Sequence, residues 1–123
     1  MAANKILRMG PVALAAAAAN IVNPPTLTGG TGLAGANTNT YIIIRHYRIV
    51  NKTAGAVTYS LFVGATAGSA AGTEVGGSAN SVPANSYVDW YGMLRLDVAD
   101  FLSGLASAAT SLTFEAEGEI GIV

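Results

Sequence analysis

The chain has 123 residues, with 6 Lys and Arg, 7 Asp and Glu, no Cys and a formal net charge of −1. This length suits one domain with a single core. The lack of Cys excludes disulfides, thiolate metal sites and a cysteine nucleophile, and the near-zero charge argues against a protein that mainly binds nucleic acid. Charged residues make up only 11% of the chain, and so weakly charged a surface is expected to be covered by partners.

Of the apolar residues, which make up 51% of the chain, 23 are alanine, and together with 15 Gly they make the chain rich in small residues. No stretch has the ~18 consecutive apolar residues that a membrane-spanning helix needs. The start imitates a signal peptide, but it is mostly alanine and Pro11 interrupts it, so we expect no cleaved signal. We therefore expect a protein made in the cytoplasm, without a membrane partner.

The N-terminal third is predicted to be extended rather than helical. Residues 4–9 are expected to form a short strand. Residues 12–22 contain alanines that favour a helix between β-branched flanks that favour a strand, and we expect an extended segment. Residues 26–40 form a loop rich in Gly, Thr and Asn, of a length usually ordered by a partner or used in function. We therefore assign residues 1–39 to an N-terminal arm and Gly/Thr-rich loop.

Residues 40–123 have the pattern of a β-domain. Residues 41–50 are β-branched and aromatic, residues 56–63 alternate, and residues 112–120 place apolar side chains on one face and glutamates on the other. A second long loop, rich in Gly, Ala and Ser, is expected at 64–81 with one short edge strand in it. Further short strands are expected at 87–91, at 93–96 and at 101–107, the last with a helical turn as the alternative. The sequence predicts an all-β antiparallel sandwich, jelly-roll-like, with about 7–8 strands.

Glu115, Glu117 and Glu119 alternate along one predicted strand face, with neighbours about 6–7 Å apart. Two such carboxylates could bind Ca²⁺ or flank a glycosidic bond. We prefer a solvated face, or pairing with Arg45 and Arg48 of a neighbouring copy.

His46 is the only histidine, and no G-x-S-x-G nucleophile motif accompanies it, so a catalytic relay is not expected. The G-x-G-x-x-G match at residues 30–35 lacks the preceding strand and following helix of a dinucleotide site. We predict no enzyme activity, no catalytic residue, no cofactor and no resident metal, and we expect His46 to lie at a subunit contact.

Aromatic residues supply the remaining candidates. Tyr41 and Tyr47 lie near Arg45, Arg48 and Lys52 in the sequence, but three cations are too few to bind nucleic acid at ordinary salt. Trp90 and Tyr91 could anchor an interface or stack on a sugar, with a core position as the alternative for Trp90.

The run from Tyr41 to Gly64 carries the pattern hydrophobic, basic, His, any residue, Arg, hydrophobic, Val-Asn-x-Thr, followed by an alternating strand. This run and the run from Val82 to Gly92 resemble small virion proteins of tailed bacteriophages, over roughly residues 40–120. The resemblance implies a β-sandwich that decorates or cements the capsid, and it brings no active site with it.

We therefore expect a virion structural protein on the capsid surface, which binds the major capsid protein, self-associates as a homotrimer and makes no direct contact with nucleic acid. The alternative is a sugar- or receptor-binding module of a spike, fibre or other tail or neck component. The interface candidates are Tyr41, Arg45, His46, Tyr47, Arg48, Trp90, Tyr91, Glu115, Glu117 and Glu119.

Overall fold

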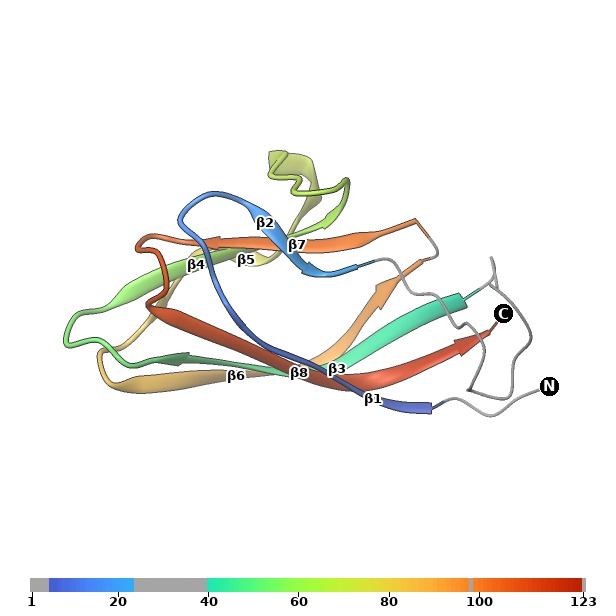
Figure 1. The fold of residues 1–123 in the computed structure, drawn as a ribbon, viewed down its shortest axis with the longest axis horizontal. Helices are drawn as coiled ribbons and strands as arrows, with labels where there is room; N and C mark the ends of the chain where they lie inside the picture. Colours follow the sequence, from blue (N-terminus) through green and yellow to red (C-terminus); the bar gives the residue numbers. More distant parts are fainter. Residues whose placement is uncertain (1–4, 24–39, 98, 123) are drawn as a thin grey trace.

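Stretches rich in β-branched and aromatic residues form two antiparallel sheets that pack face to face (Figure 1). This computed structural model describes residues 5–23, 40–97 and 99–122. The strands are β1 (Lys5–Ala13), β2 (Ala19–Val22), β3 (Thr40–Asn51), β4 (Val57–Gly64), β5 (Glu74–Val82), β6 (Ser86–Leu96), β7 (Phe101–Ala106) and β8 (Leu112–Ile122), with one helical turn, η1 (Ala71–Thr73). Within these residues, no helix is long and apolar enough to cross a bilayer.

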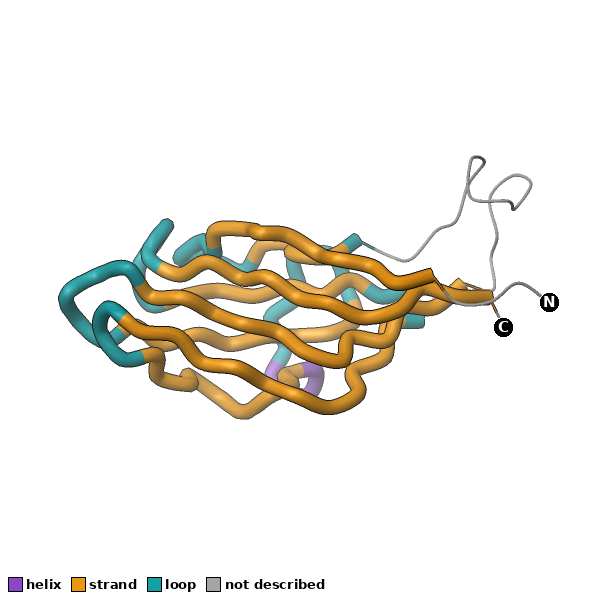
Figure 2. The backbone as a smooth tube through the Cα atoms, turned by 90° about the horizontal axis from the view of Figure 1, so that it is seen from below, coloured by secondary structure: helices purple, strands orange, loops and turns teal. Residues whose placement is uncertain are grey.

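The strand pairing is nested. Sheet A has the order β1-β8-β3-β6, and sheet B has the order β2-β7-β4-β5. Strand β1 pairs with β8, β2 with β7, β3 with β6 and β4 with β5, as in one long hairpin folded over two layers. The β3–β8 pair then joins two of these pairs into the four strands of sheet A, and the β4–β7 pair does the same in sheet B. Figure 2 shows the strands running along the long axis of the molecule. The predicted antiparallel β-sandwich is confirmed.

The core lies between the sheets, where alternate residues of each strand face inward. Ile44 and Ile49 of β3, Phe114 of β8, Leu61 of β4 and Leu102 of β7 are all fully buried. Burial of each such side chain contributes about 1.5–3 kcal/mol. The predicted alternation in β8 is confirmed, because Leu112, Phe114, Ala116 and Ile120 are buried. The strand predicted at 101–107 is confirmed as β7, whereas the stretch 64–81, expected to be a long loop with one short edge strand, contains most of the 9-residue edge strand β5.

Tyr47 occupies the centre of this core and is 2% exposed. Its ring stacks on Trp90 at 5.2 Å and on Phe114 at 5.5 Å, and its hydroxyl lies 3.2 Å from that of Tyr59. Burial, followed by the hydrogen bond to Tyr59, raises the pKa of Tyr47. From this position Tyr47 does not reach a partner, which corrects its assignment as an interface residue. Trp90 packs against the same cluster and takes the core alternative.

The predicted N-terminal arm is wrong for the residues that the structure describes. Residues 5–13 pair with β8 and residues 19–22 pair with β7, so both belong to the sandwich. Between them, Leu14 is 1% exposed and exchanges backbone hydrogen bonds with Leu112 and Thr110. Pairing with strands from the far end of the chain, rather than local propensity, decides the conformation here. Of the loop predicted at 26–40, residues 24–39 lie outside the described residues.

Leu14→Ala is expected to destabilise the protein by about 2–5 kcal/mol, because it removes a fully buried side chain and leaves a cavity. Urea unfolding followed by circular dichroism measures this loss. Ile6→Ala is the matched control, since Ile6 belongs to the same segment but is 92% exposed. An undocked arm would make both substitutions neutral, and that outcome would contradict the structure.

Candidate functional site

A β-bulge in β3 organises the outer face of sheet A. The register of β3 against both β8 and β6 shifts between Ile44 and His46. Ile44 and Tyr47 are buried, whereas Arg45 is exposed and His46 is partly exposed. Two consecutive side chains, Arg45 and His46, therefore lie on the outer face, which regular alternation would not allow.

Gly118 of β8 lies opposite Ile44, at the start of this bulge. A side chain at Gly118 would run into the backbone carbonyl of Ile43. The close approach of the two backbones therefore requires glycine at this position.

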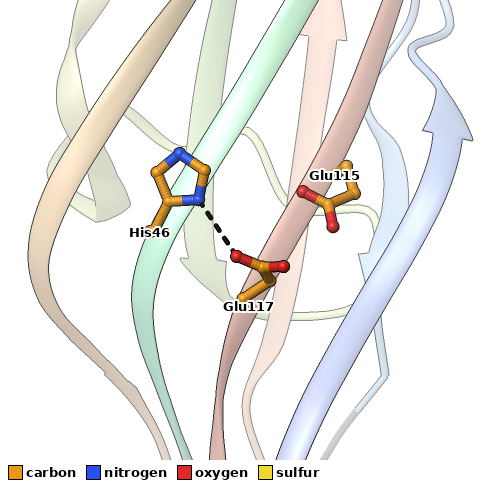
Figure 3. A group of neighbouring side chains, drawn as sticks. All are labelled: His46, Glu115 and Glu117. Atoms are coloured by element: carbon orange, nitrogen blue, oxygen red, sulfur yellow. Dashed lines mark ion pairs between the residues drawn. The ribbon is translucent and has the colours of Figure 1, made fainter.

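His46 is held on three sides by groups from the neighbouring strands. Its Nε2 lies 2.8 Å from Oδ1 of Asp89, and its ring stacks on Tyr91 at 4.7 Å. Its Nδ1 lies 3.5 Å from Oε1 of Glu117 (Figure 3). The imidazole is thus placed between two carboxylates, one from β6 and one from β8.

Asp89 is the most strongly held carboxylate of the face. Arg48 donates to both of its oxygens, from Nε at 2.7 Å and from a terminal nitrogen at 3.1 Å. The hydrogen bonds from Arg48, and then from His46, lower the pKa of Asp89 to about 2. The same pairing raises the pKa of Arg48. Asp89 is therefore ionised at neutral pH and fixes the orientation of both partners.

Other cations of the face are also matched within the chain. Arg45 Nε donates to Glu119 at 2.6 Å, and Arg95 Nε donates to Asp97 at 2.7 Å. The guanidinium of Arg95 also lies over the ring of Tyr41, at 4.5 Å from its centroid. Exposed pairs of this kind each add about 0–1 kcal/mol to stability. Their main effect here is to neutralise the charges of Arg45 and Arg95 within the chain.

The structure brings most of the sequence-predicted residues together. Sheet A presents on one face Tyr41, Arg45, His46, Arg48, Tyr91, Glu115, Glu117 and Glu119. The expected pairing of glutamates with arginines of a neighbouring copy is found within one chain for Arg45 and Glu119. Asp89 was missed as a site residue, although the alternation of residues 87–91 already put it beside Tyr91.

His46, Glu115 and Glu117 form the densest group of potential ligands. One donor atom from each lies within 4.8 Å of the others (Figure 3). An imidazole nitrogen and two carboxylates make a donor set that binds divalent metals. None of the three residues lines the hollow of about 300 Å³ at the end of β3 and the start of β6, which is lined by Val50, Asn51, Lys52, Asn85, Ser86 and Tyr87.

No protein-family model matches the chain, and no curated protein is significantly similar to it in sequence.

Asp89→Asn is expected to lower the free energy of unfolding at neutral pH. Between about pH 4 and pH 2, the free energy of unfolding of the variant should fall less steeply than that of the unmodified protein. The folded-state pKa of Asp89 is about 2 and its ordinary value is 3.8, so its contribution is complete above about pH 4 and is lost as the pH falls towards 2. Urea titrations of both proteins between pH 7 and pH 2 measure the difference. Asp97→Asn is the control, because its pair with Arg95 is more exposed; equal effects of the two substitutions would contradict the assigned role of Asp89.

Gly118→Ala is expected to cost at least about 1–3 kcal/mol, because the new methyl group meets the backbone of β3. Gly55→Ala should change stability by less than about 0.5 kcal/mol, since the space around Gly55 is open. Thermal unfolding of the two variants tests the comparison. A neutral Gly118→Ala would mean that the bulge does not need this close approach.

Proposed function

We propose that the protein is a non-enzymatic structural protein of a phage virion, which binds the major capsid protein lattice and stabilises the head. The observation that carries the proposal is a strip of exposed apolar side chains on the edge strand β6. Tyr91 is 72% exposed and Met93 is 66% exposed, and Tyr87 lies further along the same face. Large exposed side chains grouped on one strand are typical of an interaction surface.

The charges beside this strip favour docking against another protein. Arg48 and Arg45 are matched by Asp89 and Glu119 of the same chain. A partner that covers the face therefore leaves no large unmatched charge from these residues in the interface, and the desolvation penalty is lowered. The resemblance of residues 40–120 to phage virion proteins, stated from the sequence, points to the capsid as this partner.

The fold is compatible with the same role. In the part of the chain that the structure describes, eight strands form two four-stranded sheets with the nested pairs β1–β8, β2–β7, β3–β6 and β4–β5, and this pairing supports the proposal of a jelly roll. Jelly rolls are common in viral capsid proteins and in lectins. The fold therefore supports both the capsid role and the sugar-binding alternative. The exposed side chains must be used to choose between the two.

The partner is proposed to contact side chains of β6 rather than to extend sheet A by a further strand. Between Ile44 and His46, β3 has one residue, whereas the facing part of β6 has two, Gly92 and Met93. A bulge of this kind bends an edge strand and hinders continuous pairing with another strand. We expect Tyr91 and Met93 to anchor the contact, both with the capsid and within the proposed trimer.

Co-sedimentation with heads assembled without this chain tests the proposal. The double variant Tyr91→Ser, Met93→Ser is expected to bind at least tenfold more weakly than the unmodified protein, because it loses the exposed apolar anchors. Ile6→Ser is the matched control, since Ile6 is equally apolar and exposed but lies on β1, the opposite edge of sheet A. Its binding should be unchanged.

Failure of the unmodified protein to bind any such head would contradict the capsid role, and equal binding by the double variant would contradict the docking face. The sugar-binding alternative rests on the exposed ring of Tyr91, because Trp90 faces the core. Specific binding in a glycan array would favour that alternative. Sedimentation equilibrium of the purified chain measures whether it forms the expected trimer.

A further inference from the structure

We propose that His46, Glu115 and Glu117 form a binding site for a divalent transition metal of the Zn²⁺ class on the outer face of sheet A. Donor atoms of the three side chains lie within 4.8 Å of one another (Figure 3). They come from two neighbouring strands, β3 and β8, which hold their backbones in register. The site is distinct from the docking strip on β6, and it can be tested on the isolated chain.

The bulge in β3 creates this donor set. Beyond the bulge, His46 lies directly opposite Glu117, and Glu115 follows two residues along the same face. Continuing the register of Ile44 and Gly118 without the shift would put Arg45 opposite Glu117 instead. The guanidinium of Arg45 would then face the two glutamates in place of the imidazole of His46. The extra residue therefore converts an ordinary ion-pair position into a nitrogen ligand beside two carboxylates.

Asp89 supplies the carboxylate that usually accompanies a metal-binding histidine. Metal-ligating histidines usually donate their other ring N–H to a carboxylate, which fixes the ring and its tautomer. Asp89 Oδ1 lies 2.8 Å from Nε2 of His46, and Asp89 is itself held by two hydrogen bonds from Arg48. With the proton on Nε2, the lone pair of Nδ1 faces Glu117. The distance from Nδ1 to Glu117, 3.5 Å, is long for a hydrogen bond and leaves Nδ1 available to a metal.

The donor chemistry selects the metal. Ca²⁺ and Mg²⁺ prefer oxygen ligands only, whereas an imidazole with carboxylates suits Zn²⁺, Co²⁺ and Ni²⁺. Bonds of about 2.0–2.2 Å require donor atoms roughly 3–3.5 Å apart. The side chain of Glu117 is 60% exposed, so it is free to close the present spacing. Three protein ligands leave a coordination position for water or for a group from a partner.

The charges around the site set a modest affinity. Arg8 of β1 lies opposite Glu117 and is exposed, so it competes with a metal for that carboxylate. Arg45 and Arg48 are engaged by Glu119 and Asp89, which reduces their repulsion of a cation.

Calorimetric titration of the tag-free chain with Zn²⁺ tests the proposal. One Zn²⁺ per chain is expected, with binding at least tenfold tighter than that of Ca²⁺ or Mg²⁺. His46→Gln and Glu117→Gln should each weaken Zn²⁺ binding more than tenfold, and Asp89→Asn should weaken it by about 10- to 100-fold. Glu74→Gln is the control, because it removes the charge of a glutamate on β5 of sheet B, outside the donor set, and Zn²⁺ binding by this variant should be unchanged.

The composition of the chain allows X-ray absorption to identify the histidine ligand of a bound metal. The sequence contains one His and no Cys, so an imidazole ligand seen by X-ray absorption of the Zn²⁺ or Co²⁺ complex can only be His46. Thermal unfolding without metal establishes that each variant is folded. Lack of Zn²⁺ binding by the folded, unmodified chain would overturn the proposal, as would unchanged binding by His46→Gln or equal affinity for Ca²⁺. Capsid binding plays no part in these measurements, so the two proposals can fail independently.

Discussion

The register shift at Arg45 is the constraint on which the outer face and the core of sheet A both depend. It turns Arg45 and His46 outward together, and it returns Tyr47 to the interior, where its ring stacks between Trp90 and Phe114. The shift needs a close approach of β3 and β8, which Gly118 permits. Removing the bulge would therefore expose a residue that the core requires and would replace the histidine that faces the glutamates.

The edges of both sheets are irregular, and irregular edges hinder the pairing of their backbones with further strands. Charged side chains are one usual protection of edge strands, and bulges, proline and short strands are others. Strand β1 carries a bulge that includes Pro11, and β2 has only 4 residues. Strand β5 leaves its pairing with β4 between Val75 and Asn80, and β6 bulges opposite Arg45. Irregular geometry thus protects these edges in the way that charged side chains protect other edge strands. Contact of a partner with these edges would therefore use side chains rather than backbone hydrogen bonds.

Alternation predicted β3, β4 and β8 well, because each has enough large apolar residues to mark its inner face. Most of β5 instead fell in a stretch that was expected to be a loop, since Val75 and Val82 are its only large apolar residues. At the N-terminus the strand predicted at 4–9 is confirmed by β1, and β2 lies within the segment 12–22 that was expected to be extended. Alternation missed the pairing of these strands with β8 and β7 from the far end of the chain, because alanines mark no inward face. It also missed the contact of His46 with Asp89, since the two residues lie 43 positions apart. A bulge has no local signature comparable to alternation, so the faces of Arg45 and Tyr47 follow only once both neighbouring strands are placed.

Asp89 connects the two proposed roles of the face. It accepts hydrogen bonds from Arg48 and from His46, so one carboxylate both matches the cation beside the docking strip and orients the imidazole towards Glu117. Tyr91 lies on the other side of the same imidazole and is a proposed anchor of the contact. A metal on His46 would hold the ring against which Tyr91 stacks, and so would stiffen one wall of the docking strip. Because the coordination shell has room for a further ligand, a carboxylate or imidazole from the docked partner could complete it, and the contact would then gain a directional bond that apolar side chains alone do not provide.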